Sequence, residues 1–498
     1  MIRYDYEADW RPYVSPDSDI RFATSEEIQQ AYPPIDLSQP LCAGGMPVWT
    51  NGQIACLNSR DEMTIGIGFT GSGKSRRGVA PTAAFLAKAG ENIILIDVKG
   101  ELSTGSLSRY VRGALDENGY KTVFFDLRGF NGDGYNPLLL PYRLYVQNNI
   151  GESMRMLHEL YSGLAKEELE SNSDPFWALE AILCLVAFTV ALFACVHNEN
   201  QIHMLSLAML LNDSGCDALN SVKDGLHLPD TALSALNSIL SMSQKTKMSV
   251  VATAYSLIQP FVVNEKLLRM TSCTTFSIEE MLHRKCAIFI IVPDEVSSYD
   301  TFVGILISQI CASLVQLAYQ HGGRLPIRTN FLCDEFTQYN IQNMGRNISA
   351  HRSRNIRWYI WCQGLEQLKL AYPKDAPIIL ENCANLYFMN SPELSLLKYL
   401  SERSGYITDF TGAQRPLLRV EDLQTLQKTD IYTETYISMP GKQFVTRLLD
   451  VSQYPCLQYL NQTYSIPCHL PQNPVQTLTI SSLLRNALHS IHSEKYFG

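Results

Sequence analysis

The stretch "IGIGFTGSGKSRRGVAP" (residues 65–81) carries two glycines, a lysine and a serine at the spacing of a phosphate-binding loop. These residues are Gly68, Gly73, Lys74 and Ser75, in the pattern G-x-x-x-x-G-K-S. An apolar strand pattern precedes the loop and a helix pattern begins at Lys74, which is the context that the motif requires. A glycine turn with an exposed lysine is the alternative. The motif in this context predicts a site for a nucleoside triphosphate.

The residue types of the loop explain how it would hold phosphate groups. Gly71 and Gly73 let backbone N–H groups point inward without a clash at Cβ, and the start of the next helix adds partial positive charge. Lys74 would reach the β- and γ-phosphates, and Ser75 would bind Mg²⁺. Pro81 is predicted to break or kink the helix, leaving a short phosphate-bearing segment. The expected nucleotide-binding residues are Thr70, Gly71, Ser72, Gly73, Lys74 and Ser75.

Apolar runs of strand length recur outward from the loop and alternate with helix patterns. The first is "MTIGIG", which leads into the loop, and six others follow. Because these runs are apolar on both faces, they predict parallel strands covered by helices on both sides, and therefore an α/β fold. The other runs are residues 92–97, 122–126, 286–292, 329–333, 357–362 and 385–389.

The pattern changes from strands to helices in the middle of the chain. Residues 144–262 show helical spacing without a strand signal, which predicts an all-α domain inserted into the α/β domain. The nucleotide-binding motor domain would then be discontinuous, over residues 61–143 and 263–450. Residues 1–60 are rich in proline and predict a loop-rich segment packed on the motor domain, and residues 451–498 form a polar tail.

Bulk properties narrow the class of protein. The chain has 498 residues, more than the roughly 250–300 that one core supports, so several domains are expected. A net charge of −9 excludes a wholly basic nucleic-acid coat but allows a local basic channel.

The 13 cysteines lack a C-x-x-C pair and fit buried thiols in a reducing compartment. Residues 181–196 are apolar but shorter than the about 20 residues of a membrane span, so a core helix in a soluble, cytoplasmic protein is expected.

A carboxylate pair at a strand end completes the expected chemistry. "NFLCDEF" places Asp334 and Glu335 directly after an apolar strand. Asp334 could hold Mg²⁺ through water, and Glu335 could orient or deprotonate the attacking water. The alternative is an ordinary solvated strand end. In a chain with a phosphate loop, the pair predicts triphosphate hydrolysis.

Two further side chains fit the same reaction. Gln363 follows the strand after the Asp334 strand, where an amide could sense the γ-phosphate, although it could also be a plain loop residue. Arg352 lies between these two strands and could act as an arginine finger from a neighbouring subunit. Alternatively, Arg352, Arg354 and Arg357 form a solvated basic stretch. Asp97, with Lys99 and Glu101 in "DVKGEL", could form an ion-pair network near the site, with separate roles that spacing does not reveal.

Taken together, the motifs resemble those of the type IV coupling proteins of conjugative secretion systems. "GFTGSGKS", "DVKGEL", "YNPL", "DPFW", "CDEF" and "CQGLEQL" occur here in that family's order. The resemblance extends from about residue 21 to about residue 440. It implies a RecA-like motor domain with an inserted all-α domain and a proline at the place of Pro81. It also implies a Walker A pair at Lys74 and Ser75 and a Walker B pair at Asp334 and Glu335. The matching finger arginine is Arg352, and the glutamine of the third motor motif is Gln363.

The resemblance also implies partners. Family members are thought to form hexameric rings at the cytoplasmic membrane, where they recruit relaxase-bound single-stranded DNA and couple ATP hydrolysis to its transfer. They usually begin with membrane-spanning helices, and this sequence shows none, so attachment to the inner face of the membrane through a partner protein is expected. Arg76, Arg77 and the arginines of residues 352–357 are candidates for DNA contact by charge alone.

Three functions remain open at this level. The first is an ATP-driven, single-stranded-DNA-translocating coupling protein with ATP and Mg²⁺ as ligands. The second is a nucleotide-switched module that recruits a relaxase or effector without translocation. The third is a double-stranded-DNA pump, which would share the motor domain but not the inserted helices.

Overall fold

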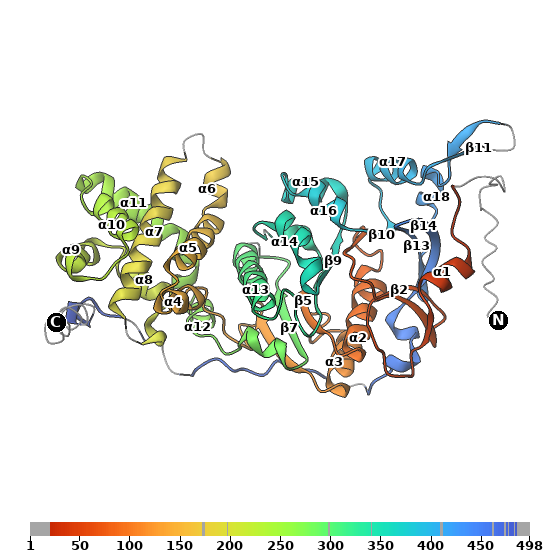
Figure 1. Ribbon diagram of the computed structural model, residues 1–498, viewed down its shortest axis with the longest axis horizontal. Helices are drawn as coiled ribbons and strands as arrows, with labels where there is room; N and C mark the ends of the chain where they lie inside the picture. Colours follow the sequence, from red (N-terminus) through yellow and green to blue (C-terminus); the bar gives the residue numbers. More distant parts are fainter. Residues whose placement is uncertain are drawn as a thin grey trace.

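The computed structural model describes residues 20–485, except 172–174, 197, 297–298, 340, 409–411, 461–462, 473–474, 477 and 483. Residues 1–19 of the expected N-terminal segment, Asp174 of the DPFW motif and residues 486–498 of the expected tail lie outside the described residues. Figure 1 shows two lobes, a sheet flanked by helices on the right and a bundle of helices on the left. The predicted division into α/β and all-α parts is visible in this arrangement.

A nine-stranded sheet forms the centre of the larger lobe, in the order β14-β13-β10-β4-β9-β8-β5-β7-β6. All neighbouring pairs from β10 to β6 are parallel, and the β13–β14 hairpin adds antiparallel to β10. The seven parallel strands are the seven apolar runs of the sequence, so the α/β prediction is confirmed. The strands are β4 (Thr64–Gly68), β5 (Asn92–Val98), β6 (Lys121–Asp126), β7 (Cys286–Val292), β8 (Thr329–Cys333), β9 (Ile356–Cys362), β10 (Asn385–Asn390), β13 (Tyr432–Met439) and β14 (Lys442–Leu449).

The apolar runs are continuous because each strand contributes to two cores. In β5, Ile94 and Ile96 belong to one core, whereas Ile93 and Leu95 belong to the other. Helices α2 and α3 cover the second core, and the later helices of the motor domain cover the first. The covering helices are α2 (Ala80–Lys88), α3 (Ser108–Glu117), α13 (Asp300–Gln320), α14 (Met344–His351), α15 (Leu365–Ala371), α16 (Ala376–Asn382), α17 (Leu394–Arg403) and α18 (Val420–Gln424).

The helix after the phosphate loop begins where predicted, but it does not break at Pro81. It runs as a π-helix over Lys74–Val79 and continues as α2 over Ala80–Lys88. In the π-helix, the Ala80 N–H donates to the carbonyl of Ser75, five residues back. Pro81 then lies in the first turn of α2, directly after the π-helix, where it lacks one backbone donor but does not end the helix. The predicted break was therefore wrong, because the chain changes helix type instead of ending the helix.

Residues 34–58 form a small antiparallel sheet, so the prediction of a loop-rich N-terminal segment was wrong for this part. The sheet has the order β1-β3-β2 and shares a core with α2. Pro34 lies in β1 and Pro47 in β2, the two edge strands, where a missing N–H is tolerated. The prolines that suggested loops are therefore compatible with strands. The elements are α1 (Ser25–Ala31), β1 (Pro34–Asp36), β2 (Met46–Thr50) and β3 (Ile54–Asn58).

The smaller lobe is formed by the helices between β6 and β7, and the described residues of this segment contain no strand of its own. The helices extend over residues 139–271, further at both ends than the predicted 144–262. The first helix contains Pro141 in its first turn, where proline is tolerated. The helices are α4 (Leu139–Val146), α5 (Ile150–Leu164), α6 (Lys166–Ser171), α7 (Phe176–Cys195), α8 (Met204–Ala208), α9 (Asp213–Val222), α10 (Asp230–Leu240), α11 (Gln244–Val263) and α12 (Glu265–Thr271).

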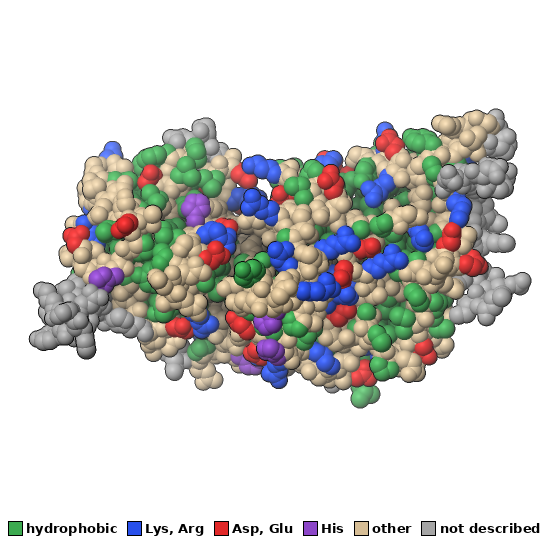
Figure 2. Space-filling view, viewed as in Figure 1, with side chains coloured by type: hydrophobic (Ala, Val, Ile, Leu, Met, Phe, Trp, Pro, Cys, Tyr) green, Lys and Arg blue, Asp and Glu red, His purple; other side chains and the backbone are tan. Residues whose placement is uncertain are grey.

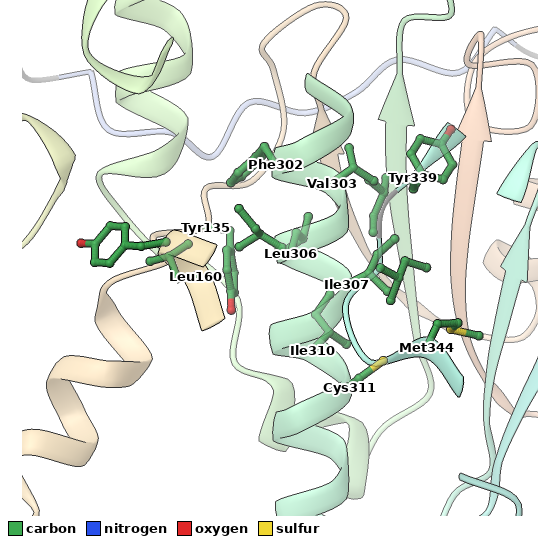
Figure 3. Close-up of a cluster of buried hydrophobic side chains, with 14 of the residues drawn as sticks. Tyr135, Leu160, Phe302, Val303, Leu306, Ile307, Ile310, Cys311, Tyr339 and Met344 are labelled. Carbon is green, nitrogen blue, oxygen red and sulfur yellow. The ribbon is translucent and has the colours of Figure 1, made fainter. Parts of the chain in front are cut away.

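Among the described residues, two helices, α7 and α13, have the length and hydropathy to cross a membrane. However, 78% of the apolar window of α7 and 67% of that of α13 are buried inside the protein. Figure 3 shows α13 between Tyr135 and Leu160 on one side and Tyr339 and Met344 on the other. Both helices therefore serve as core helices here, as predicted for residues 181–196, and α13 joins the two lobes through one continuous core.

The C-terminal segment runs back across both lobes. Figure 1 shows it along the lower edge of the molecule, from the sheet toward the helical lobe. Arg112 of α3 donates to the carbonyl of Ser465 at 2.9 Å, and Arg269 of α12 donates to the carbonyl of Pro471 at 2.8 Å. The described part of this tail is therefore bound to the motor domain and to the helical lobe.

Candidate functional site

Three adjacent strands end at the phosphate loop. Strand β4 leads into the loop, β9 lies beside β4 and ends before Gln363, and β8 lies beside β9 and ends before Asp334. Because the three strands are parallel, their carboxyl ends meet at one edge of the sheet, which is where open α/β sheets bind ligands. The strand order therefore brings the predicted glutamine and carboxylates to the loop.

The loop itself has the backbone that its glycines predict. Gly71 has a φ of 84° and Gly73 a φ of 103°, a region that other residues rarely adopt. A Cβ on Gly73 would also lie 2.5 Å from the Arg77 Nη1. The loop and its neighbours enclose a pocket of about 260 Å³. Its lining includes Thr70, Gly71, Gly73, Lys74 and Ser75, whereas Ser72 is buried behind it.

Lys74 is held between its own loop and a carboxylate of β8. Its Nζ donates to the carbonyl of Gly68 at 2.7 Å and lies 3.1 Å from Glu335 Oε1. Gln363 Nε2 donates to the other oxygen of Glu335 at 3.1 Å. Glu335 has a φ of 54° and a ψ of 48°, the left-handed region that costs a non-glycine residue about 1–2 kcal/mol. The structure thus brings Lys74, Glu335 and Gln363 together and holds Glu335 in a strained conformation.

Asp334 and Ser75 form the second pair of the site. The Ser75 hydroxyl donates to Asp334 Oδ2 at 2.5 Å, although the two residues are 259 positions apart. The other oxygen, Oδ1, is buried and has no hydrogen-bond partner among the residues that the structure describes. Burial raises the pKa of Asp334 to about 6, partly offset by the bond from Ser75. An unpartnered carboxylate oxygen beside a hydroxyl at a phosphate loop fits an oxygen-coordinated divalent cation such as Mg²⁺.

The polar cluster of "DVKGEL" is arranged differently from the predicted ion-pair network. Asp97 accepts bonds from the N–H groups of Leu102 and Ser103, and burial raises its pKa to about 7. Lys99 lies 3.4 Å from Asp294 instead of pairing with Asp97. Asp97 therefore orders its own loop, because the turn at Lys99 points the lysine away from it. Lys99 and Glu101 line the nucleotide pocket.

Arg352 does not reach the phosphate loop of its own chain. It lies exposed in a short 3₁₀ turn after α14, and it is not among the residues that line the pocket. Arg357, by contrast, is fully buried and pairs with Glu91 at 2.5 Å. The alternative of a solvated basic stretch from Arg352 to Arg357 is therefore wrong for Arg357, because the strand turns this side chain into the protein.

The chain matches the family described as "Type IV secretory system Conjugative DNA transfer" over residues 21–429. The chain belongs to this conjugative DNA-transfer family. The resemblance that its motifs indicate is thereby confirmed at the level of the family, and the family acts in conjugative DNA transfer with type IV secretion systems.

Solved structures of a conjugative coupling protein share the fold. The plasmid coupling protein TrwB in complex with ADP and Mg²⁺ is 14% identical, with a TM-score of 0.60, and the match covers 90% of this chain and 96% of that chain. TrwB in complex with a non-hydrolysable ATP analogue is 13% identical, also with a TM-score of 0.60, over 92% and 97% of the two chains. No curated protein sequence matches the chain. At this identity, the structures support a common fold for this member of the conjugative DNA-transfer family.

The sequence analysis of this family member missed a group of residues from the end of the motor domain. Arg76 donates to both oxygens of Asp450, at 2.7 and 2.8 Å, and Arg77 donates to the carbonyl of Thr429 at 2.6 Å. Arg77 is also buried, so its assignment as a candidate DNA contact was wrong, and Arg76 is held by a carboxylate. Lys428 lies at the rim of the nucleotide pocket. The local signal for this contact was the pair Arg76 and Arg77 directly after the phosphate loop, since two adjacent positive charges favour a nearby carboxylate such as Asp450.

Proposed function

We propose that this chain is an ATP-driven coupling protein that recruits relaxase-bound single-stranded DNA, or an effector protein, and moves it to a type IV secretion channel. The cluster of Lys74, Glu335 and Gln363 beside the Ser75–Asp334 pair carries the proposal. Similar TrwB structures hold ADP with Mg²⁺ or an ATP analogue. These ligands support ATP and Mg²⁺ as the ligands of this chain.

Each residue of the cluster has a distinct chemical task in this proposal. Bound Mg²⁺ would neutralise charge on the β- and γ-phosphates. Asp334 and the Ser75 hydroxyl would hold it, and the free Oδ1 of Asp334 supplies the oxygen. Lys74 would leave Glu335 and bind the β- and γ-phosphates. Glu335, once released, would orient the attacking water or accept its proton, and Gln363 would relay the state of the γ-phosphate to moving parts.

A ring of subunits would complete the site. Arg352 is exposed and remote from the nucleotide pocket of its own chain, so it would act on the pocket of a neighbour. An arginine finger supplied in trans stabilises the charge that develops on the phosphates. We therefore propose a homo-oligomer, and a hexamer by resemblance to the family.

We assign the motor domain to residues 61–138 and 272–450 and substrate recruitment to the helical lobe at residues 139–271, whose bounds replace the predicted 144–262. The segment 1–60 would pack on the motor domain, and the tail 451–498 would be held through its described residues, which contact both lobes. A partner protein at the inner face of the cell membrane, together with components of the secretion channel, would hold the ring in place.

The surface has a feature that favours nucleic-acid binding. A cleft of about 730 Å³ lies beside α5 and α13, and its charged lining residues are Glu152, Arg155, Glu159 and Arg354. Figure 2 shows a hollow between the lobes and Lys and Arg side chains that gather to its right. The two glutamates balance the two arginines of the cleft, so the Lys and Arg side chains beside the hollow would be the ones that bind a phosphate backbone. DNA affinity should therefore fall steeply with rising salt concentration.

One experiment tests the proposed function most directly. ATP hydrolysis is measured against protein concentration, with and without single-stranded DNA, for the wild type and Lys74→Ala. We expect a rate per molecule that rises with concentration and with single-stranded DNA, and no turnover in Lys74→Ala. A Lys74→Ala protein as fast as the wild type would exclude this loop as the ATP site. Stronger stimulation by double-stranded DNA would favour a duplex pump.

A second candidate is a recruitment module that uses the nucleotide only as a switch. The first turns of α7 leave Phe176, Trp177, Leu179 and Leu183 exposed by 38–52%. A group of exposed apolar side chains at the start of a helix favours docking of another protein. Tight ATP binding without turnover, with and without DNA, would support this candidate over the motor.

A further inference from the structure

We propose that Lys428 is a second lysine of the nucleotide site, which binds the α-phosphate of ATP and of ADP. Lys428 lies between α18 and β13, and its ammonium group donates to the carbonyl of Gly71 in the phosphate loop. It lines the same pocket as Lys74 and Ser75. This assignment rests on the proposed function, because it adds a residue to the same site.

The segment that carries Lys428 is tied to the loop on both sides of the lysine. Arg77 donates to the carbonyl of Thr429 at 2.6 Å, and the Thr433 hydroxyl donates to the carbonyl of Ser72 at 3.3 Å. A β-bridge joins Lys428 to Thr433 and closes the turn between them. The backbone of Lys428 therefore stays beside the loop when its ammonium group changes partner.

The order of the strands decides which end of the nucleotide lies near Lys428. The proposed γ-phosphate residues, Glu335 and Gln363, follow β8 and β9, on one side of β4. Lys428 precedes β13, which lies on the other side of β4, beyond β10. A triphosphate with its γ-phosphate at Glu335 therefore extends from Lys74 toward Lys428. The phosphate nearest the nucleoside is the one that comes within reach.

The charge of Lys428 is free for this purpose. Among the described residues, no carboxylate lies within ion-pair distance of its ammonium group, whereas Lys74 is paired with Glu335. A backbone carbonyl is a neutral acceptor, and a phosphate oxygen forms a charge-assisted bond that is roughly twice as strong. A lysine ammonium also has three donors, so it can keep the Gly71 carbonyl while it binds phosphate.

The test is binding of Mg²⁺-ATP and Mg²⁺-ADP to the full chain by isothermal titration calorimetry. Lys428→Ala should weaken both ligands by the same factor, roughly tenfold for an exposed charge-assisted bond. Lys428→Arg should restore most of the affinity, because it keeps the charge. Lys245→Ala, which removes an exposed lysine of α11 in the helical lobe, is the control and should bind both ligands as the wild type does.

Three results would overturn the assignment of Lys428 and leave the proposed function in place. The first is unchanged affinity in Lys428→Ala, and the second is a loss confined to ATP, which would place the lysine at the γ-phosphate. The third is a nucleotide-free Lys428→Ala protein that melts at a lower temperature than the wild type, by enough to explain the weaker binding through loss of folded protein. In that case the lysine would only stabilise the structure. If the wild type hydrolyses ATP and Lys428→Ala binds both nucleotides as tightly as the wild type, the role of Lys428 is refuted but the proposed function is not. A wild type that binds neither nucleotide would refute both this assignment and the proposed function.

Discussion

The Lys74–Glu335 ion pair must open before either residue can act on a nucleotide, and this predicts the behaviour of Glu335→Gln. The two groups are 3.1 Å apart, with the lysine 5% and the glutamate 18% exposed. At that distance and an effective dielectric constant of 20, the Coulomb energy is about 5 kcal/mol before desolvation. Hydrogen bonds between charged groups contribute a net of about 1.5–3 kcal/mol. Opening the pair therefore costs about 1.5–3 kcal/mol, and this cost opposes ATP binding.

Glu335→Gln removes the charge but keeps an oxygen that can accept from Lys74, so only part of this energy is released. We expect about 1.4 kcal/mol, which corresponds to roughly tenfold tighter binding of Mg²⁺-ATP. Hydrolysis should fall by about 10²–10⁴-fold, the usual contribution of a general base. The variant should therefore bind ATP more tightly than the wild type and retain it.

The assay is calorimetric titration with Mg²⁺-ATP, followed by a single-turnover measurement of phosphate release. Glu366→Gln is the matched control, because Glu366 forms an exposed pair with Lys369 on α15, away from the pocket. It should leave both affinity and rate unchanged. A Glu335→Gln protein that binds ATP no more tightly than the wild type would refute the ion pair as a barrier to binding. Hydrolysis at the wild-type rate would refute Glu335 as the base.

Three more predictions follow from other contacts. Burial lowers the pKa of His351 to about 3, so it is neutral when folded but takes a proton near pH 6.5 when unfolded. The free energy of unfolding should thus fall as pH drops from about 6.5. In urea unfolding, the difference in this free energy between the wild type and His351→Gln should shrink by about 2 kcal/mol from pH 7 to pH 5. Glu91→Gln breaks the buried pair with Arg357 and should lower the free energy of unfolding by about 3–5 kcal/mol in the same assay. If Arg352 acts in trans, mixing Arg352→Ala with Lys74→Ala subunits should restore ATP hydrolysis that neither has alone. An inactive mixture that still assembles would argue against a shared site.

Much of the fold could be predicted because its signals are local. A parallel strand covered on both faces must be apolar at every position, and all seven such runs became strands. The phosphate loop is equally local, since its glycines, lysine and serine act within eight consecutive residues. Predictions failed where one residue type fits two structures. Pro34 indicated a loop but lies on an edge strand, and Pro81 indicated a break but lies in the first turn of a helix.

The sequence by itself therefore determined the strands, the loop and the residue types that a triphosphate site needs. Only the tertiary structure decided which of these residues meet. Asp334 bonds Ser75 and Glu335 pairs with Lys74 because only β9 separates β8 from β4 in the sheet, a strand order that no local pattern encodes. Lys428 reaches Gly71 from 357 residues away because β13 adds to the sheet on the opposite side. The physical reason is the same for each contact: side-chain periodicity sets the conformation of a segment, whereas partners depend on the order in which segments pack.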